Sequence, residues 1–305
     1  MTFGLLTWKV FLLLLYIAVG FMCRKINITN ELTEQSLTNL LMKVTIPCLL
    51  IASLGTSPLV GGNSTLIYCG IIFTGYYLVC LPVLRIFFRT KKLSQEKMAV
   101  ATCMVAFPNI TFFGFTMLTA VLGPASVSYG AVMCAVFTVI FFTYGMSLFQ
   151  QELDIKSIIT PVNIATIIML ALFIGNVHLP EKIHTILMQF GSLTMPIALI
   201  VIGGNIANSD LMTALKNKGL YAISFTRLVL IPVLLMACIW PLQMSDTLRM
   251  ALLIGIACPT GWLPAVVAKQ TNMESEFASQ AVIHCTFFSV LTMPVLILAM
   301  QYLLG

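Results

Sequence analysis

The sequence predicts an all-α membrane protein whose ten transmembrane helices form two inverted five-helix repeats. Three observations carry this prediction: composition, long apolar runs and an internal repeat. Of the 305 residues, 59% are hydrophobic and only 9% are charged, and the mean hydropathy is +1.02. Soluble proteins carry about 25% charged residues, which excludes a soluble enzyme or nucleic-acid binder. A β-barrel is disfavoured because its strands alternate apolar and polar residues.

The apolar runs account for almost the whole chain. A helix needs about 20 apolar residues to cross a ~30 Å hydrocarbon core, and charge, Gly or Pro mark where each run stops. The connections are too short to hold a soluble domain. The ten predicted spans are 3–23, 35–54, 64–88, 97–121, 125–149, 157–177, 183–207, 217–240, 246–268 and 276–303.

The basic residues orient these spans, because Lys and Arg gather in cytoplasmic loops. With the N-terminus outside, the external loops hold only Lys182 and Arg249. We therefore predict a multi-pass protein of the cell membrane with both termini outside. The net charge of +6 then faces the lipid bilayer and requires no nucleic-acid partner. The cytoplasmic side holds Arg24, Lys25, Arg85, Arg89, Lys91, Lys92, Lys97, Lys156, Lys216, Lys218 and Lys269.

The two halves of the chain, 1–150 and 151–305, resemble each other at an offset close to 150 residues. Each half would hold five spans, an odd number, so the second half must lie inverted in the membrane. Inverted repeats are the architecture of alternating-access transporters. The matches are Thr45-Ile46-Pro47 with Thr194-Met195-Pro196, Leu81-Pro82 with Ile231-Pro232, Pro108 with Pro259, and Ser128, Cys134 and Phe137 with Ser279, Cys285 and Phe288.

Spans 4 and 9 are predicted to break at corresponding prolines. A proline in a helix removes a backbone donor and clashes with the preceding turn, which lipid tolerates only beside protein or a water-filled cavity. The half-helix N-termini exposed by such breaks attract anions. Polar neighbours favour a site over a simple kink, so we predict that substrate binds at Pro108, Asn109, Thr111, Pro259 and Thr260. Asn109 is also a suitable cap for the second half-helix.

Several motifs resemble the auxin efflux carrier family, which includes the PIN-type auxin transporters and prokaryotic malate permeases. The resemblance covers essentially the whole chain. It rests on Ile46-Pro47, on Phe107-Pro108-Asn109 followed by Phe113-Gly114-Phe115, on Met195-Pro196-Ile197-Ala198-Leu199-Ile200-Val201-Ile202-Gly203 and on Ser289-Val290-Leu291-Thr292-Met293-Pro294.

The resemblance implies a scaffold of spans 1, 2, 6 and 7 and a moving transport domain of spans 3–5 and 8–10. Broken spans 4 and 9 would cross near the midplane, with the substrate carboxylate beside the crossover. It further implies a homodimer through the scaffold and an elevator-like motion. The plant carriers have an asparagine near the second crossover proline, whereas Cys258 and Thr260 flank it here, which argues against auxin itself. We expect a secondary transporter of a small organic anion, a mono- or dicarboxylate.

Three ionisable residues within spans are further candidates. A charged side chain inside a bilayer is costly, so a functional role is the first hypothesis for such a residue. Arg227 lies ~15 Å into span 8 at 1.5 Å per residue. We assign it to the substrate site, with a structural network as the alternative. Lys43 either snorkels to the inner face or serves gating or coupling. His284 could couple protons, or could be a satisfied core histidine.

Three other kinds of membrane protein are alternatives to this assignment. A sodium-coupled symporter of the bile-acid type would need more polar residues near the crossover. An intramembrane enzyme is not expected, because the chain has no HExxH, no GxSxG and no intramembrane pair of acids. The paired broken spans argue against a purely structural or sensory protein. The nine cysteines form no CxxC pair and suit buried apolar positions, so we expect no metal and no cofactor.

Overall fold

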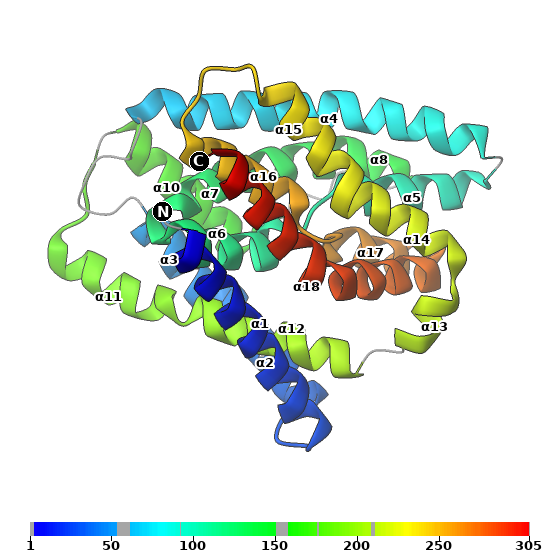
Figure 1. Ribbon diagram of the computed structural model, residues 1–305, viewed down its shortest axis with the longest axis horizontal. Coiled ribbons are helices and arrows are strands. Elements are labelled where there is room, and N and C mark those ends of the chain that lie inside the picture. The colour runs from blue at the N-terminus through cyan, green and yellow to red at the C-terminus, as the bar shows by residue number, and fades with distance from the viewer. Residues whose placement is uncertain are drawn as a thin grey trace.

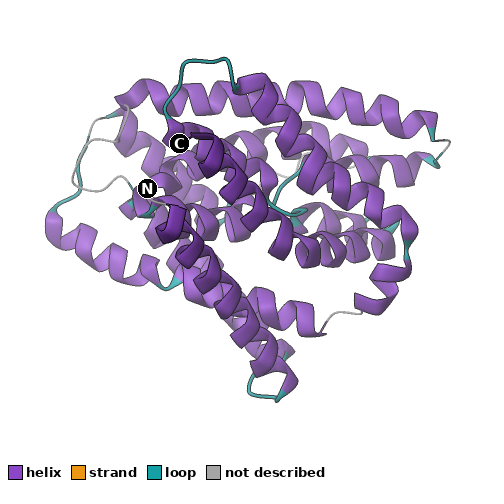
Figure 2. Cartoon of the chain, viewed as in Figure 1, coloured by secondary structure: helices purple, strands orange, loops and turns teal. Residues whose placement is uncertain are grey.

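The computed structural model describes residues 3–53, 62–91, 93–150, 158–175, 177–208 and 211–304. Within these ranges the chain is helical throughout, and it has no β-strand beyond an isolated bridge between Pro108 and Thr260. Figure 2 shows helices joined by short loops. Lys92, Lys156 and the outer end of predicted span 35–54 lie outside the described residues.

Helices occupy each of the ten predicted ranges. Six stretches are long and apolar enough to cross a membrane, and shorter apolar helices cover 110–122 and 161–174. The first half contains α1 Phe3–Lys25, α2 Glu31–Leu40, η1 Leu41–Thr45, α3 Ile46–Ala52, α4 Gly62–Thr90, α5 Gln95–Ala106, η2 Ile110–Gly114, α6 Phe115–Leu122, η3 Pro124–Ser126, α7 Val127–Ile140, η4 Phe141–Gly145 and α8 Met146–Leu148. The second half contains α10 Pro161–Ile174, α11 Glu181–Ser192, α12 Thr194–Asn208, α13 Leu211–Lys216, α14 Lys218–Phe225, η5 Thr226–Leu230, α15 Ile231–Ile239, α16 Asp246–Ala257, α17 Trp262–Gln270 and α18 Ser275–Leu304.

Polar caps explain several of these boundaries. Asn30 accepts a hydrogen bond from the Thr33 amide at the start of α2, and Ser94 accepts one from the Lys97 amide at the start of α5. Such side chains satisfy amides that have no partner within the helix.

Two prolines follow π-helical turns. Pro47 lies two residues after the end of η1, and Pro232 lies two residues after the end of η5. The extra residue of a π turn relieves the clash between the proline ring and the preceding turn. The helix therefore continues through each of these positions, whereas it breaks at Pro108 and Pro259.

Helices α1 and α12 pack backbone to backbone (Figure 1). A Cβ on Gly203 would collide with the Ile17 carbonyl, and one on Gly20 would collide with the Ile200 carbonyl. Small residues at membrane helix interfaces permit this close approach. The contact joins spans 1 and 7, both of which the family resemblance assigns to the scaffold.

Candidate functional site at the helix crossover

The two proline breaks pair with each other. Helix α5 ends at Ala106 and α16 ends at Ala257, and each is followed by a short extended segment. The Asn109 amide donates to the Pro259 carbonyl at 2.8 Å, and the Gly261 amide donates to the Phe107 carbonyl at 2.8 Å. Proline disfavours helical geometry in the residue before it. The breaks therefore expose backbone groups that satisfy one another.

Gly261 permits the close approach of the two segments. A Cβ at this position would lie 3.1 Å from the Phe107 carbonyl oxygen. That distance is tighter than an ordinary contact and involves rigid backbone. A glycine at the second crossover therefore maintains the pairing.

Side chains cap the carbonyls at the end of α5. Thr260 Oγ1 donates to the Met104 carbonyl at 2.8 Å, and the Tyr76 hydroxyl donates to the Ala106 carbonyl at 2.6 Å. The last carbonyls of a helix have no partner within it, and leaving them unpaired in a buried site is costly. These two side chains therefore hold the first half-helix at the crossover.

Arg227 joins the ends of both broken helices. The residue is fully buried, and its guanidinium carries the positive charge that helix C-termini favour. Every nitrogen of the guanidinium donates to a backbone carbonyl, and Nη1 also donates to the Tyr76 hydroxyl at 2.9 Å. The carbonyl acceptors are Val105 at 3.1 Å from Nη1, Ile256 at 2.6 Å from Nη2 and Cys258 at 3.0 Å from Nε.

The half-helices that follow the breaks start in different ways. Asn109 caps the first, since its Oδ1 accepts from the Phe112 amide at 3.2 Å. The second begins at Trp262, after Gly261, and no side chain caps it. A helix N-terminus carries partial positive charge and unpaired amides. The uncapped start at Trp262 is therefore the better suited of the two to an anion.

A cavity of about 730 Å³ lies beside the crossover. Among the described residues that line it, Lys43 has the only charged side chain, and that residue is exposed. Asn39, Asn109 and Asn205 contribute amides. The remaining lining residues are Thr38, Met42, Phe112, Phe113, Thr160, Pro161, Val162, Ile202, Ile206, Trp262, Val282, Ile283 and Thr286. The cavity is thus mainly apolar, with one cation and a few polar groups, which is typical of a small-molecule site.

The cavity walls come from two groups of helices. One wall is built from α2, η1, α10 and α12, and the other from η2, α17 and α18. Lys43 lies on the first wall and Asn109 on the second. These walls correspond to the predicted scaffold spans 2, 6 and 7 and the predicted transport spans 4, 9 and 10.

Not all predicted site residues reach this cavity. Asn109 and Lys43 line it. Pro108, Pro259 and Thr260 lie within the paired segments of the crossover. Thr111 instead approaches Cys134, with Oγ1 and Sγ 3.6 Å apart, so its predicted contact with the substrate is not supported.

Arg227 and His284 also lie outside the cavity lining. The donors of Arg227 are directed to backbone carbonyls and Tyr76. This arrangement fits the alternative, a structural network, and the role of Arg227 as a ligand stays a prediction. His284 is buried, and its Nδ1 lies 2.6 Å from Ser224 Oγ. Its ring packs against Tyr221 and Phe288. Its Nε2 is buried and has no hydrogen-bond partner among the described residues, so His284 is not a fully satisfied core histidine, and its role in coupling stays a prediction.

Sequence reasoning missed Tyr76. The neighbouring Tyr77 corresponds to Arg227 at the 150-residue offset that relates Pro82 to Pro232. Comparing the two repeats at the position of the buried arginine would have drawn attention to this pair of tyrosines.

Comparison with known proteins adds one finding. A family model described as membrane transport protein matches the chain twice, over residues 5–155 and over residues 150–297. The two consecutive matches confirm the sequence repeat. No curated protein matches the chain in sequence.

Proposed function

Because the chain belongs to the membrane transport protein family, that of the auxin efflux carriers and PIN-like proteins, we propose that it is a secondary transporter of a small organic anion. The observation that carries the proposal is the cavity beside the crossover, in which Lys43 is the only charged residue among the described lining residues. Asn109 and the uncapped start of α17 lie on the opposite wall. A carboxylate between these groups would meet a cation and partly positive helix ends. No enzyme activity is proposed.

The lining favours a monocarboxylate with an apolar body. Phe112, Phe113, Trp262 and Ile202 offer apolar contacts for such a body. A dicarboxylate such as malate would bring a second charge for which the lining offers no second cation, and an unpaired charge in a partly dehydrated site is costly. An auxin-like or aliphatic acid therefore suits the cavity better.

The mechanism we propose is elevator-type alternating access. Ten spans would form two inverted five-helix repeats, with residues 1–150 and 151–305 as the repeats. Spans 1, 2, 6 and 7 would be the scaffold and spans 3–5 and 8–10 the transport domain, and broken spans 4 and 9 would cross near the midplane. The cavity between these two groups supports the mechanism, because a domain that slides past a scaffold carries its site along the boundary. The Arg227 network would let both broken helices move as one unit.

The proposed setting is the cell membrane, with both termini outside and a homodimer formed through the scaffold. The apolar helices and the transporter family support a multi-pass membrane protein. The uneven distribution of Lys and Arg supports the orientation.

Ligand-induced thermal stabilisation of the purified protein tests the proposed site. We expect apolar monocarboxylates to raise the melting temperature of the wild type, because a ligand that binds only the folded state stabilises it. Lys43→Gln removes the cation and should abolish most of this shift. Lys182→Gln removes the charge of an exposed lysine outside the cavity. This variant should retain the ligand-induced shift in melting temperature. Equal shifts for all three proteins would contradict the site, and a shift that requires sodium would favour the bile-acid-type alternative.

A further inference from the structure

A second, smaller groove is lined by residues of α15, α16 and α18. Its volume is about 290 Å³. Trp240 closes one end, and all the other lining side chains are apolar as well. They are Pro232, Val233, Met236, Ala237, Leu253, Leu296, Ala299, Met300 and Leu303. None of the groove residues lines the central cavity, so this groove has no part in the proposed substrate site.

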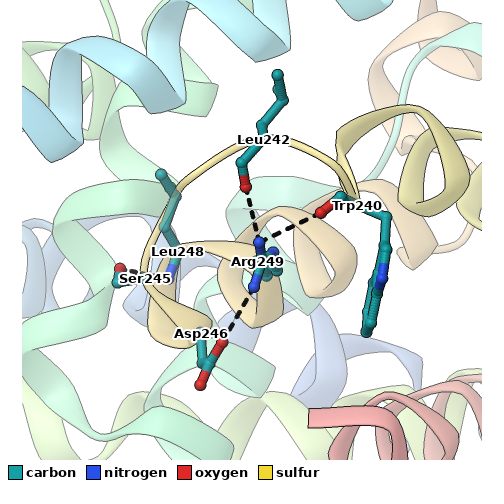
Figure 3. A network of polar contacts seen from close by, with 6 residues as sticks. All are labelled: Trp240, Leu242, Ser245, Asp246, Leu248 and Arg249. Carbon is teal, nitrogen blue, oxygen red and sulfur yellow. Dashed lines mark hydrogen bonds and ion pairs between the residues drawn. The ribbon is translucent and has the colours of Figure 1, made fainter.

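The groove ends at a polar cluster (Figure 3). The Arg249 guanidinium carbon lies 5.5 Å from the centre of the Trp240 ring. Arg249 Nη1 donates to Asp246 at 3.2 Å, and Nη2 donates to the Leu242 carbonyl at 2.7 Å. Arg249 also lies one helical turn before Leu253, a groove residue on α16, so the two share a face of the helix.

The guanidinium has one donor left for a ligand. It carries five N–H groups, and its hydrogen bonds to protein among the described residues are those to Asp246, to Leu242 and, at 3.3 Å, to the Trp240 carbonyl. That leaves one N–H on Nη1, because Nε, which also has no partner among the described residues, is buried and closed to a ligand. An arginine with a free donor beside a tryptophan is suited to a phosphate at the membrane interface.

The length of the groove fits one leaflet. Pro232 and Trp240 mark its ends on α15 and are eight residues apart, or ~12 Å at 1.5 Å per residue. Half of a ~30 Å hydrocarbon core is ~15 Å. A lipid chain that extends from a headgroup at Trp240 would therefore follow the groove over most of its leaflet.

We propose that this groove and its polar cluster bind a single phosphatidylethanolamine molecule. One acyl chain fills the groove, the phosphate meets Arg249, and the ammonium meets the Asp246 carboxylate. Charge complementarity selects this headgroup. The Asp246 side chain is 63% exposed beside the 17% exposed Arg249 side chain, so a cation and an anion are presented together. Phosphatidylglycerol carries the same phosphate but no ammonium, so its headgroup would leave the Asp246 carboxylate without a cation from the lipid.

Quenching of Trp240 by brominated lipids tests the proposal. The chain has three tryptophans, so Trp8→Phe and Trp262→Phe leave Trp240 as the reporter, and the readout does not depend on transport. The protein is reconstituted into mixed bilayers of phosphatidylethanolamine and phosphatidylglycerol, with brominated chains on one lipid and then on the other. We expect phosphatidylethanolamine to be preferred about three- to fivefold, the size of effect expected from one surface charge pair.

Variants separate the headgroup contacts from the groove. Asp246→Asn, a change at an exposed side chain, should remove the preference. Arg249→Gln should lower quenching by both lipids, because both carry the phosphate. Ala237→Phe fills the groove without touching the polar cluster and should also lower quenching by both lipids. Lys182→Gln, outside the groove, should change neither result. Equal quenching by the two lipids before any of these substitutions, or a preference that survives Asp246→Asn, would overturn the proposal.

Discussion

Replacing Arg227 by methionine should destabilise the protein severely, whatever ligand is present. Methionine keeps an unbranched apolar stem but is shorter than arginine and has no donor, so three buried carbonyls, those of Val105, Ile256 and Cys258, lose their partner. Each unpaired buried group costs about 1–3 kcal/mol. Removing the buried charge recovers part of its desolvation cost, so the lower limit applies, about 3 kcal/mol in total. At about 2 °C per kcal/mol, the melting temperature should fall by roughly 6 °C.

Thermal unfolding of the purified protein in detergent measures this change. Arg85→Met is a matched control, because Arg85 is exposed and makes only a 3.4 Å contact with the Tyr144 hydroxyl. Its effect should stay within about 0.5 kcal/mol. The loss of stability in Arg227→Lys should lie between those of Arg227→Met and Arg85→Met. An ammonium still donates, but it offers fewer donors and lacks the fixed fork of a guanidinium. If Arg227→Met unfolds at the same temperature as Arg85→Met but no longer binds carboxylates, Arg227 is a ligand and the network argument is refuted.

Two further predictions concern the crossover and the scaffold. Thr260→Val leaves the Met104 carbonyl without its donor and should cost about 1–3 kcal/mol; chemical unfolding measures this, and an unchanged midpoint would contradict it. Gly203→Val places side-chain atoms against the Ile17 carbonyl between α1 and α12, so little folded protein should be recovered by size-exclusion chromatography. Gly75→Ala, where a Cβ meets nothing within 4 Å, is its control and should express normally.

The helical ranges could be predicted because they depend on local properties of the sequence. Run length and the limits set by charge, glycine and proline define each helix, and the predicted ranges contain helices throughout. The breaks at Pro108 and Pro259 were predicted for the same reason, since proline acts on its own backbone. The prolines that do not break a helix were harder to assess. Pro47 and Pro232 each follow a π turn, and the sequence carries no simple signal for such a turn.

The partners of the site residues could not be predicted. Arg227 was recognised as a buried charge, but three of its acceptors are backbone carbonyls on other helices, which have no side-chain signature. Thr111 was assigned to the substrate because it follows the break, yet the turn of the helix directs its side chain toward Cys134. The orientation of a side chain around a helix depends on packing between helices that are far apart in sequence.

Uptake of a labelled apolar monocarboxylate into proteoliposomes tests the central claim most directly, namely that an anion crosses the membrane bound beside the crossover. The account predicts saturable uptake by the wild type that is largely lost in Asn109→Ala and in Lys43→Gln, one from each wall of the cavity. Lys182→Gln should transport at the wild-type rate. Wild-type uptake by both cavity variants, with correct folding and insertion, would contradict the account.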